Sequence, residues 1–103
     1  MTAKIHLIER ENNIWLINKE HAEWESGWWV VAPNTAEQLI GGHIYFHKTQ
    51  AKPSFFGGTI ISYRIEAEGE WSGRVVFKFC AGPEFKDVKA GSTGWGMEKK
   101  VVL

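Results

Sequence analysis

The sequence predicts a mainly β domain of the α+β class, a small β-barrel or a strongly curved sheet with one or two short helices. Segments rich in β-branched and aromatic residues alternate with short stretches that contain Gly, Pro or Asn, the residues typical of turns. With 103 residues, the chain has the usual size of one domain with a single hydrophobic core. We therefore expect residues 1–103 to form one domain.

The order of the expected elements follows from these patterns. Strands are expected at residues 3–9, 14–17, 28–32, 43–50, 59–68, 74–80 and 101–103. Asn18 is a suitable N-cap and predicts a short helical turn that runs to Trp24. Residues 34–38 have the form of a capping box and predict a short helix that ends at Gly41. Residues 51–58, with one Pro and paired Gly, are expected to form a loop between two long strands.

Charge and composition exclude several classes of function. Twelve basic residues balance twelve acidic ones, whereas charge-driven binding to nucleic acid normally requires a basic excess. Cys80 is the only cysteine, so an intramolecular disulfide is excluded. No stretch approaches the ~20 apolar residues of a membrane span, and residues 1–10 lack the pattern of a signal peptide. We expect a cytoplasmic protein without membrane association.

A family resemblance rests on the strand and glycine pattern over roughly residues 14–80. The residues that carry it are Ile14-Trp15-Leu16-Ile17-Asn18 followed by Trp24, then Leu39-Ile40-Gly41-Gly42-His43-Ile44-Tyr45-Phe46, Phe55-Phe56-Gly57-Gly58-Thr59-Ile60-Ile61-Ser62 and Arg74-Val75-Val76-Phe77. This pattern resembles the PUA-like barrels, and the EVE family more than the ASCH family. The chain departs from it by an extra strand at residues 3–9 and by lacking the Gly-x-Lys-x-x-Glu pattern of ASCH domains. The resemblance implies a pocket between barrel and helices that accepts a nucleobase, often a modified one.

The stretch from His47 to Phe56 is the strongest candidate for a binding loop. It combines a titratable ring, cations, polar groups and two adjacent aromatic rings: His47, Lys48, Gln50, Ser54, Phe55 and Phe56. A flat ligand could stack on either Phe while Gln50, Ser54 or Lys48 bonds its edge or a phosphate. In the alternative interpretation, Phe56 anchors the loop to the core and the polar groups are solvated.

The tryptophans and Arg64 complete the predicted site. Trp28 and Trp29 are adjacent in an expected strand, so they point to opposite faces, and one of them can fill the core while the other meets solvent, a helix or a ligand. Trp24 and Trp28 are the expected ligand contacts, and Trp15 is expected in the core. Arg64 either pairs with Glu66 or a cross-strand partner at the surface, or forms a pocket wall that contacts an anionic or carbonyl group.

These residues support three hypotheses of different classes. The leading one is a small domain that binds a nucleobase, a modified nucleotide, nucleic acid or a similar flat polar ligand in an aromatic pocket. The second is a small hydrolase or amidohydrolase that uses Lys48, Thr49 or Ser54 near Glu66 or His47. The third is a protein-interaction module whose exposed tryptophans and edge strand meet a partner or a second copy of the chain in a homodimer. No cofactor is expected, and no metal, because His43 and His47 share a strand face without a third ligand.

Overall fold

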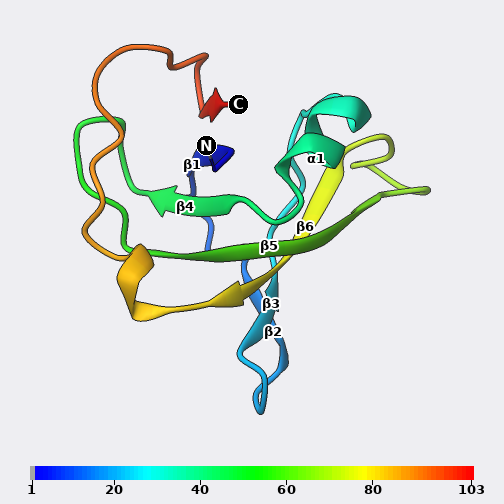
Figure 1. Ribbon diagram of the computed structural model, residues 1–103. Coiled ribbons are helices and arrows are strands. Elements are labelled where there is room, and N and C mark those ends of the chain that lie inside the picture. Colours follow the sequence, from blue (N-terminus) through cyan, green and yellow to red (C-terminus); the bar gives the residue numbers. More distant parts are fainter. Residues whose placement is uncertain (1) are drawn as a thin grey trace.

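The computed structural model describes residues 2–103 and contains one open, seven-stranded sheet (Figure 1). The strand order is β2-β3-β6-β5-β4-β1-β7, so that β2 and β7 form the two edges. The elements are β1 (Lys4–Ile8), β2 (Trp15–Asn18), β3 (Glu23–Glu25), α1 (Pro33–Leu39), β4 (His43–His47), β5 (Phe56–Ile65), β6 (Val75–Ala81), the 3-10 turn η1 (Pro83–Phe85) and β7 (Lys99–Val102). The predicted mainly β class is confirmed, and the sheet is not closed into a barrel.

Strand β1 occupies a special place in the sheet. It pairs in parallel with β4, with Ile5 opposite Ile44, and in antiparallel fashion with β7, with Ile5 opposite Val101. All other strand pairs are antiparallel. The chain between β1 and β4 carries β2, β3 and α1 and returns to the same end of the sheet, whereas the β2–β3 hairpin projects away from the body (Figure 1).

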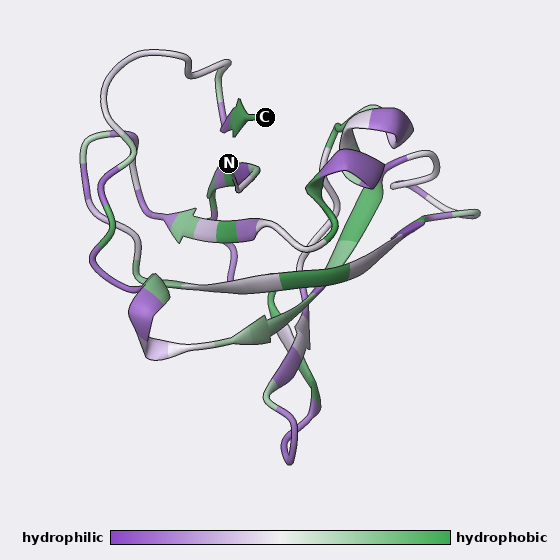
Figure 2. Ribbon diagram, in the orientation of Figure 1, coloured by the Kyte–Doolittle hydropathy of each residue, from purple (hydrophilic) through white to green (hydrophobic). Residues whose placement is uncertain are grey.

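One face of the sheet and α1 enclose the hydrophobic core. Strand alternation brings every second residue of β1, β4 and β6 to this face, and Figure 2 shows hydrophobic segments along β4, β5 and β6. The buried core residues are Ile5, Leu7, Trp29, Val31, Ala36, Leu39, Ile44, Phe46, Ile60, Val75, Phe77 and Phe79. No helix in the described part of the chain is long and apolar enough to cross a membrane.

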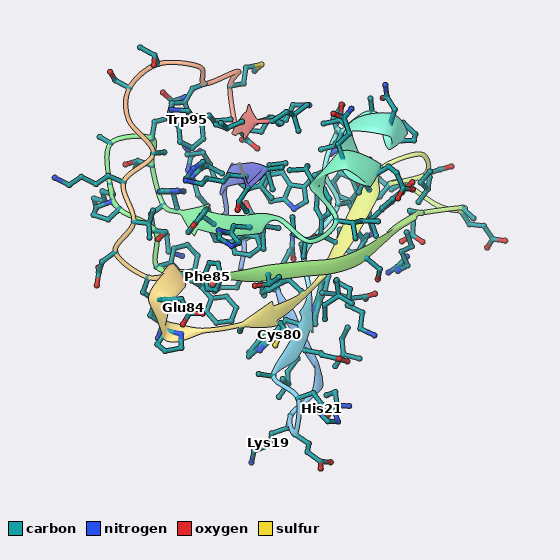
Figure 3. All side chains as sticks on the ribbon, in the orientation of Figure 1. Lys19, His21, Cys80, Glu84, Phe85 and Trp95 are labelled. Atoms are coloured by element: carbon teal, nitrogen blue, oxygen red, sulfur yellow. The ribbon has the colours of Figure 1, made fainter. Side chains whose placement is uncertain are left out.

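The opposite side of β1 and β4 is covered by residues from the long C-terminal segment. His6 stacks on Tyr45 with ring centroids 4.8 Å apart, and Trp95 approaches His6 at 6.3 Å. Phe85 lies 5.6 Å from Tyr45, and Figure 3 shows Phe85 and Trp95 at separate points along this segment. These contacts explain why residues of β4 are buried on both sides of the sheet.

The predicted helical turn from Asn18 to Trp24 is wrong, because the chain forms a β-hairpin there. Asn18 does accept a hydrogen bond from the backbone N–H of His21, at 3.2 Å. Ala22 then has a φ of 52°, in the left-handed region, which turns the chain back. Trp24 consequently lies in β3, where it pairs with Leu16 on one side and Phe79 on the other.

Two further local predictions differ from the structure. The expected strand at residues 28–32 is reduced to one bridge between Trp29 and Val75, because Pro33 begins α1 shortly afterwards. The helix N-cap is Ala32, and Asn34 bonds the adjacent Thr35 N–H instead of capping the helix. The predicted stop at Gly41 is confirmed by its φ of 84°.

The paired glycines 57 and 58 belong to strand β5 and not to the predicted loop. Gly57 lies opposite Tyr45, and Gly58 lies opposite Ile44 in β4 and Ala81 in β6. A Cβ on Gly58 would stand 2.2 Å from the Cys80 carbonyl oxygen, and one on Gly57 would stand 2.2 Å from that of Ile44. The glycines therefore permit close strand approach and do not serve as a turn.

We expect Gly58→Ala to lower the free energy of unfolding by about 2–3 kcal/mol, because the new methyl group must displace backbone in the middle of the sheet. Urea unfolding followed by circular dichroism measures this change. Gly96→Ala is the matched control, since its Cβ would meet nothing closer than 3.9 Å. Equal stability of the two variants would contradict the close approach described for Gly58.

Candidate functional site

A cleft of about 560 Å³ opens where the end of β1, the segment after β3 and the start of β7 meet. Its volume lies within the range of small-molecule pockets. It is lined by Ile8, Glu9, Arg10, Glu11, Asn13, Gly27, Trp28, Trp29, Val30, Trp71, Arg74, Gly96, Met97, Glu98 and Lys99. We call this space the tryptophan cleft.

Aromatic rings form one wall of the tryptophan cleft. Trp28 and Trp71 stack with centroids 5.6 Å apart and an interplanar angle of 12°. Trp15 packs edge-on against Trp28 at 5.2 Å, and the Arg74 guanidinium lies 4.8 Å from the Trp71 ring centroid. Trp28, Trp71 and Arg74 thus line the cleft with flat groups, of the kind that accept aromatic or cationic ligands, and Trp15 supports Trp28 from outside the lining.

Backbone pairing and one carboxylate fix Trp28 in this wall. Trp29 exchanges two backbone hydrogen bonds with Val75, both of 2.9 Å, so Trp29 enters the core and Trp28 points the other way. The Trp28 indole N–H donates to Glu66 at 2.7 Å, and Arg64 donates to the other oxygen of Glu66 at 3.2 Å. The hydrogen bond from Trp28, followed by the charge of Arg64, lowers the pKa of Glu66.

Arg64 does not line the cleft but contacts Glu66, which in turn bonds Trp28. It also pairs with Glu25 across the sheet at 3.2 Å, so both interactions that define it are surface ion pairs. This geometry matches the first of the two sequence interpretations, a cation paired with Glu66 and a cross-strand partner. Its connection with the cleft runs through Glu66 to the Trp28 ring.

Glu9 provides a buried acceptor in the tryptophan cleft. Only 3% of the residue is exposed, and its Oε2 atom accepts the backbone N–H groups of Glu11 at 2.8 Å and Asn13 at 3.3 Å. Among residues 2–103, its other oxygen, Oε1, has no hydrogen-bond or ion-pair partner. Gly27 makes this arrangement possible, because a Cβ there would stand 2.9 Å from Asn13 Cβ.

Trp29 carries an unused hydrogen-bond donor. Within the described part of the chain, its Nε1 is the one buried side-chain nitrogen or oxygen without a hydrogen-bond partner. An unpaired buried donor costs about 1–3 kcal/mol. Trp29 also contributes to the lining of the tryptophan cleft.

The charges around the tryptophan cleft balance. Its lining includes the carboxylates of Glu9, Glu11 and Glu98 and the cations of Arg10, Arg74 and Lys99. The Lys99 ammonium donates to the Val30 carbonyl and so links two walls of the cleft. Polyphosphate sites carry a clear excess of positive charge, so this lining suits a polar ligand of low net charge.

A second, shallower space of about 290 Å³ holds other predicted site residues. It is lined by Asn12, Ile14, Trp24, Phe55 and Phe56, and we call it the phenylalanine hollow. Trp24 packs edge-on against Phe56 with centroids 5.0 Å apart. The Lys48 ammonium lies 4.4 Å from the Phe55 ring centroid, in a cation–π contact.

The remaining predicted residues hold the structure together around these spaces. Ser54 is buried, and its hydroxyl donates to the Phe85 carbonyl at 2.6 Å and accepts the Val88 N–H at 3.0 Å. Gln50 donates to the carbonyl of Met97, at the rim of the tryptophan cleft, over 2.8 Å. The structure therefore divides the predicted site: Trp28 lies in one space, and Trp24, Phe55 and Phe56 lie in the other.

His47 is fully buried in a hydrogen-bonded pair with His6. Its Nδ1 contacts the Lys52 carbonyl at 2.9 Å and must donate, since a carbonyl only accepts. Its Nε2 is then the acceptor for His6 Nδ1–H, also at 2.9 Å. Burial, followed by the charges of His47, Lys100 and Lys4, lowers the pKa of His6 to about 4, and burial also lowers the pKa of His47.

The His6–His47 pair predicts an acid-sensitive fold. Because the folded pKa of His6 lies near 4 and the unfolded value is 6.5, the unfolded chain binds the proton first as pH falls. This contribution to stability is fully present well above pH 6.5 and declines between pH 6.5 and 4, by on the order of 3 kcal/mol. Thermal unfolding across this range should show a shallower decline in His6→Phe, whereas the exposed His21→Asn should keep the slope of the parent protein.

Three residues of the tryptophan cleft were missed by sequence reasoning. Trp71 and Arg74 lie in and after the 69–73 turn, and a Trp in a Gly-containing turn was a usable signal, because so large an apolar ring needs a packing partner. The burial of Glu9 could not be predicted from the sequence, because it depends on the hydrogen bond from Glu11 and on the close approach of Asn13 to Gly27.

Comparison with known proteins gives no independent guide to this site. No protein-family model, curated protein or solved structure matches the chain. The geometry of the cleft is therefore the basis for the functional argument.

Proposed function

We propose that this chain is a binding domain for a nucleobase or a similar flat polar ligand, which packs against Trp28 and Trp71 in the tryptophan cleft. The observation that carries the proposal is the stacked tryptophan pair beside a buried carboxylate in a cleft of about 560 Å³. Stacking on an aromatic side chain contributes about 1–3 kcal/mol per base. The PUA-like resemblance of the sequence leads to the same class of ligand.

Arg74 marks the place that a flat ligand can take. Its planar guanidinium lies over Trp71, and it has no ion pair with any of residues 2–103. A ligand ring that replaces it on Trp71 breaks no ion pair within the chain. The displaced guanidinium can then donate hydrogen bonds to a carbonyl or phosphate oxygen of the ligand.

Glu9 favours ligands that present an N–H group. An ionised carboxylate only accepts hydrogen bonds, and its Oε1 has no partner among the described residues. The exocyclic amino group of cytosine can donate to this oxygen, whereas the corresponding uracil carbonyl would repel it. Cytidine and uridine thus form a matched pair of probes.

We expect cytidine to bind at least about 10-fold more tightly than uridine, as one good polar contact provides about 1–3 kcal/mol of discrimination. Isothermal titration calorimetry measures both affinities. Trp71→Ala should weaken cytidine binding by about 5- to 150-fold, and Glu9→Gln should reduce the preference for cytidine. Lys19→Gln, at the tip of the β2–β3 hairpin and outside the tryptophan cleft, serves as the control, with unchanged nucleoside binding. A panel of nucleosides and nucleobases that shows no binding refutes the proposal.

A second candidate function is self-association through the edge strand β2. Trp15, Leu16 and Ile17 are each between 42% and 48% exposed on this strand, whose outer edge has no partner among residues 2–103. Exposed, apolar edge strands favour pairing with another chain. The expectation that Trp15 lies in the core is wrong for the same reason, since an edge strand beyond the body leaves it partly in solvent.

We expect Leu16→Lys to abolish any dimer, because a charge on the exposed edge opposes strand pairing. Light scattering over a range of protein concentrations measures the molar mass. Lys19→Gln, at the tip of the same hairpin (Figure 3), is the control and should leave the mass unchanged. A parent protein that is monomeric at every concentration would exclude this function.

The hydrolase hypothesis receives no support from these contacts. Ser54 bonds backbone groups of Phe85 and Val88, whereas His47 bonds His6 and Lys52. A nucleophile must instead contact its base directly.

A further inference from the structure

The tryptophan cleft and the phenylalanine hollow share one wall. In the segment that follows β1, Glu11 and Asn13 line the cleft, whereas Asn12 and Ile14 line the hollow. Asn12, with a φ of 57° in the left-handed region, marks a turn in this segment. Two aromatic spaces therefore lie back to back across a single length of backbone.

Only a short length of chain separates the two spaces. Residues 9 and 14 are joined by five peptide units, which span at most about 18 Å when fully extended. This span is an upper limit on the Cα–Cα separation of Glu9, which lines the cleft, and Ile14, which lines the hollow. A mononucleotide fills one space only, whereas a short strand can place one base in each.

Two cations connect the spaces at the surface. Arg10 lines the tryptophan cleft, and its Nε donates to the backbone carbonyl of Lys48 at 3.3 Å. The Lys48 ammonium in turn lies over Phe55, which lines the phenylalanine hollow. Both side chains are exposed, and neither has an ion pair among residues 2–103. Two cations thus lie between the aromatic spaces, next to a cleft lining whose charges balance.

We propose that the ligand is a short single-stranded nucleic acid, with one base against Trp28 and Trp71, another against Phe55 and Trp24, and the intervening phosphate between Arg10 and Lys48. The proposal rests on the proposed function and adds a second base site and a phosphate site to it. Aromatic platforms joined by cations are the general means by which proteins bind single strands. One neutralised phosphate predicts a salt slope of about −0.7, far smaller than that of charge-driven binding.

The test is a length series of oligocytidylates, from cytidine 5′-monophosphate to the tetranucleotide, in both the ribose and deoxyribose forms. We expect affinity to rise at least 10-fold in one step, at the length that first reaches both spaces. Phe55→Leu, which keeps apolar packing but removes the flat ring, should abolish the step, whereas Trp71→Ala should weaken the monophosphate and the longer oligonucleotides alike. Thermal unfolding of each variant verifies that it is folded.

The salt dependence of the affinity tests the phosphate contact separately. Arg10→Gln and Lys48→Gln should each reduce the magnitude of the salt slope for the tetranucleotide, and the double variant should remove about 0.7 of it. Lys19→Gln removes one positive charge at the hairpin tip, away from the proposed path, and should leave the slope unchanged (Figure 3). Equal effects of all three variants would overturn the assigned phosphate site.

Failure of this inference differs from failure of the proposed function. Oligonucleotides that bind no more tightly than the monophosphate, while cytidine still binds and depends on Trp71, would overturn the two-base inference alone. The same result follows if Phe55→Leu retains the affinity step. If neither cytidine nor any oligonucleotide binds, both the inference and the proposed function are overturned.

Discussion

The parallel pairing of β1 with β4 is the constraint on which the other features depend. Parallel neighbours need a long crossover, and here residues 9–42 make it. The crossover supplies the β2–β3 hairpin, the segment with Trp28 and Trp29, and α1, which covers the core. It begins at Glu9, directly after β1, so the two aromatic spaces form around its first residues. The same topology that closes the core also creates the candidate site.

Much of the fold was predictable because its strands carry strong local patterns. β1, β2, β4, β6 and β7 were each expected close to their observed positions, since β-branched and aromatic residues concentrate there. Errors arose where tertiary contacts override local signals. Asn18 does bond His21, but β3 pairs with β6 and so favours a hairpin over a helix. Gly58 resembles a turn residue, although the carbonyl of Cys80 is what requires it.

The candidate site was less predictable than the fold, because its members are distant in sequence. Trp28 was identified from strand alternation, but Trp71 reaches it only through the turn between β5 and β6. His47 and Ser54 have the residue types of a reactive site, yet both are buried with backbone partners. Sequence pattern predicted the direction of the Trp28 and Trp29 side chains, because packing direction follows from the strand. Residue type alone was a poor guide to the role of polar groups, because that role depends on which hydrogen-bond partners they find in the fold.

The shared wall after β1 has a consequence for how such a domain can change over evolution. Residues 9–14 contribute side chains to both spaces, and Asn12 turns the chain between them with a φ of 57°. Asn tolerates this left-handed conformation, whereas a β-branched residue does not. A substitution of Asn12 would therefore disturb the walls of both spaces at once, so the two spaces cannot change independently at this position.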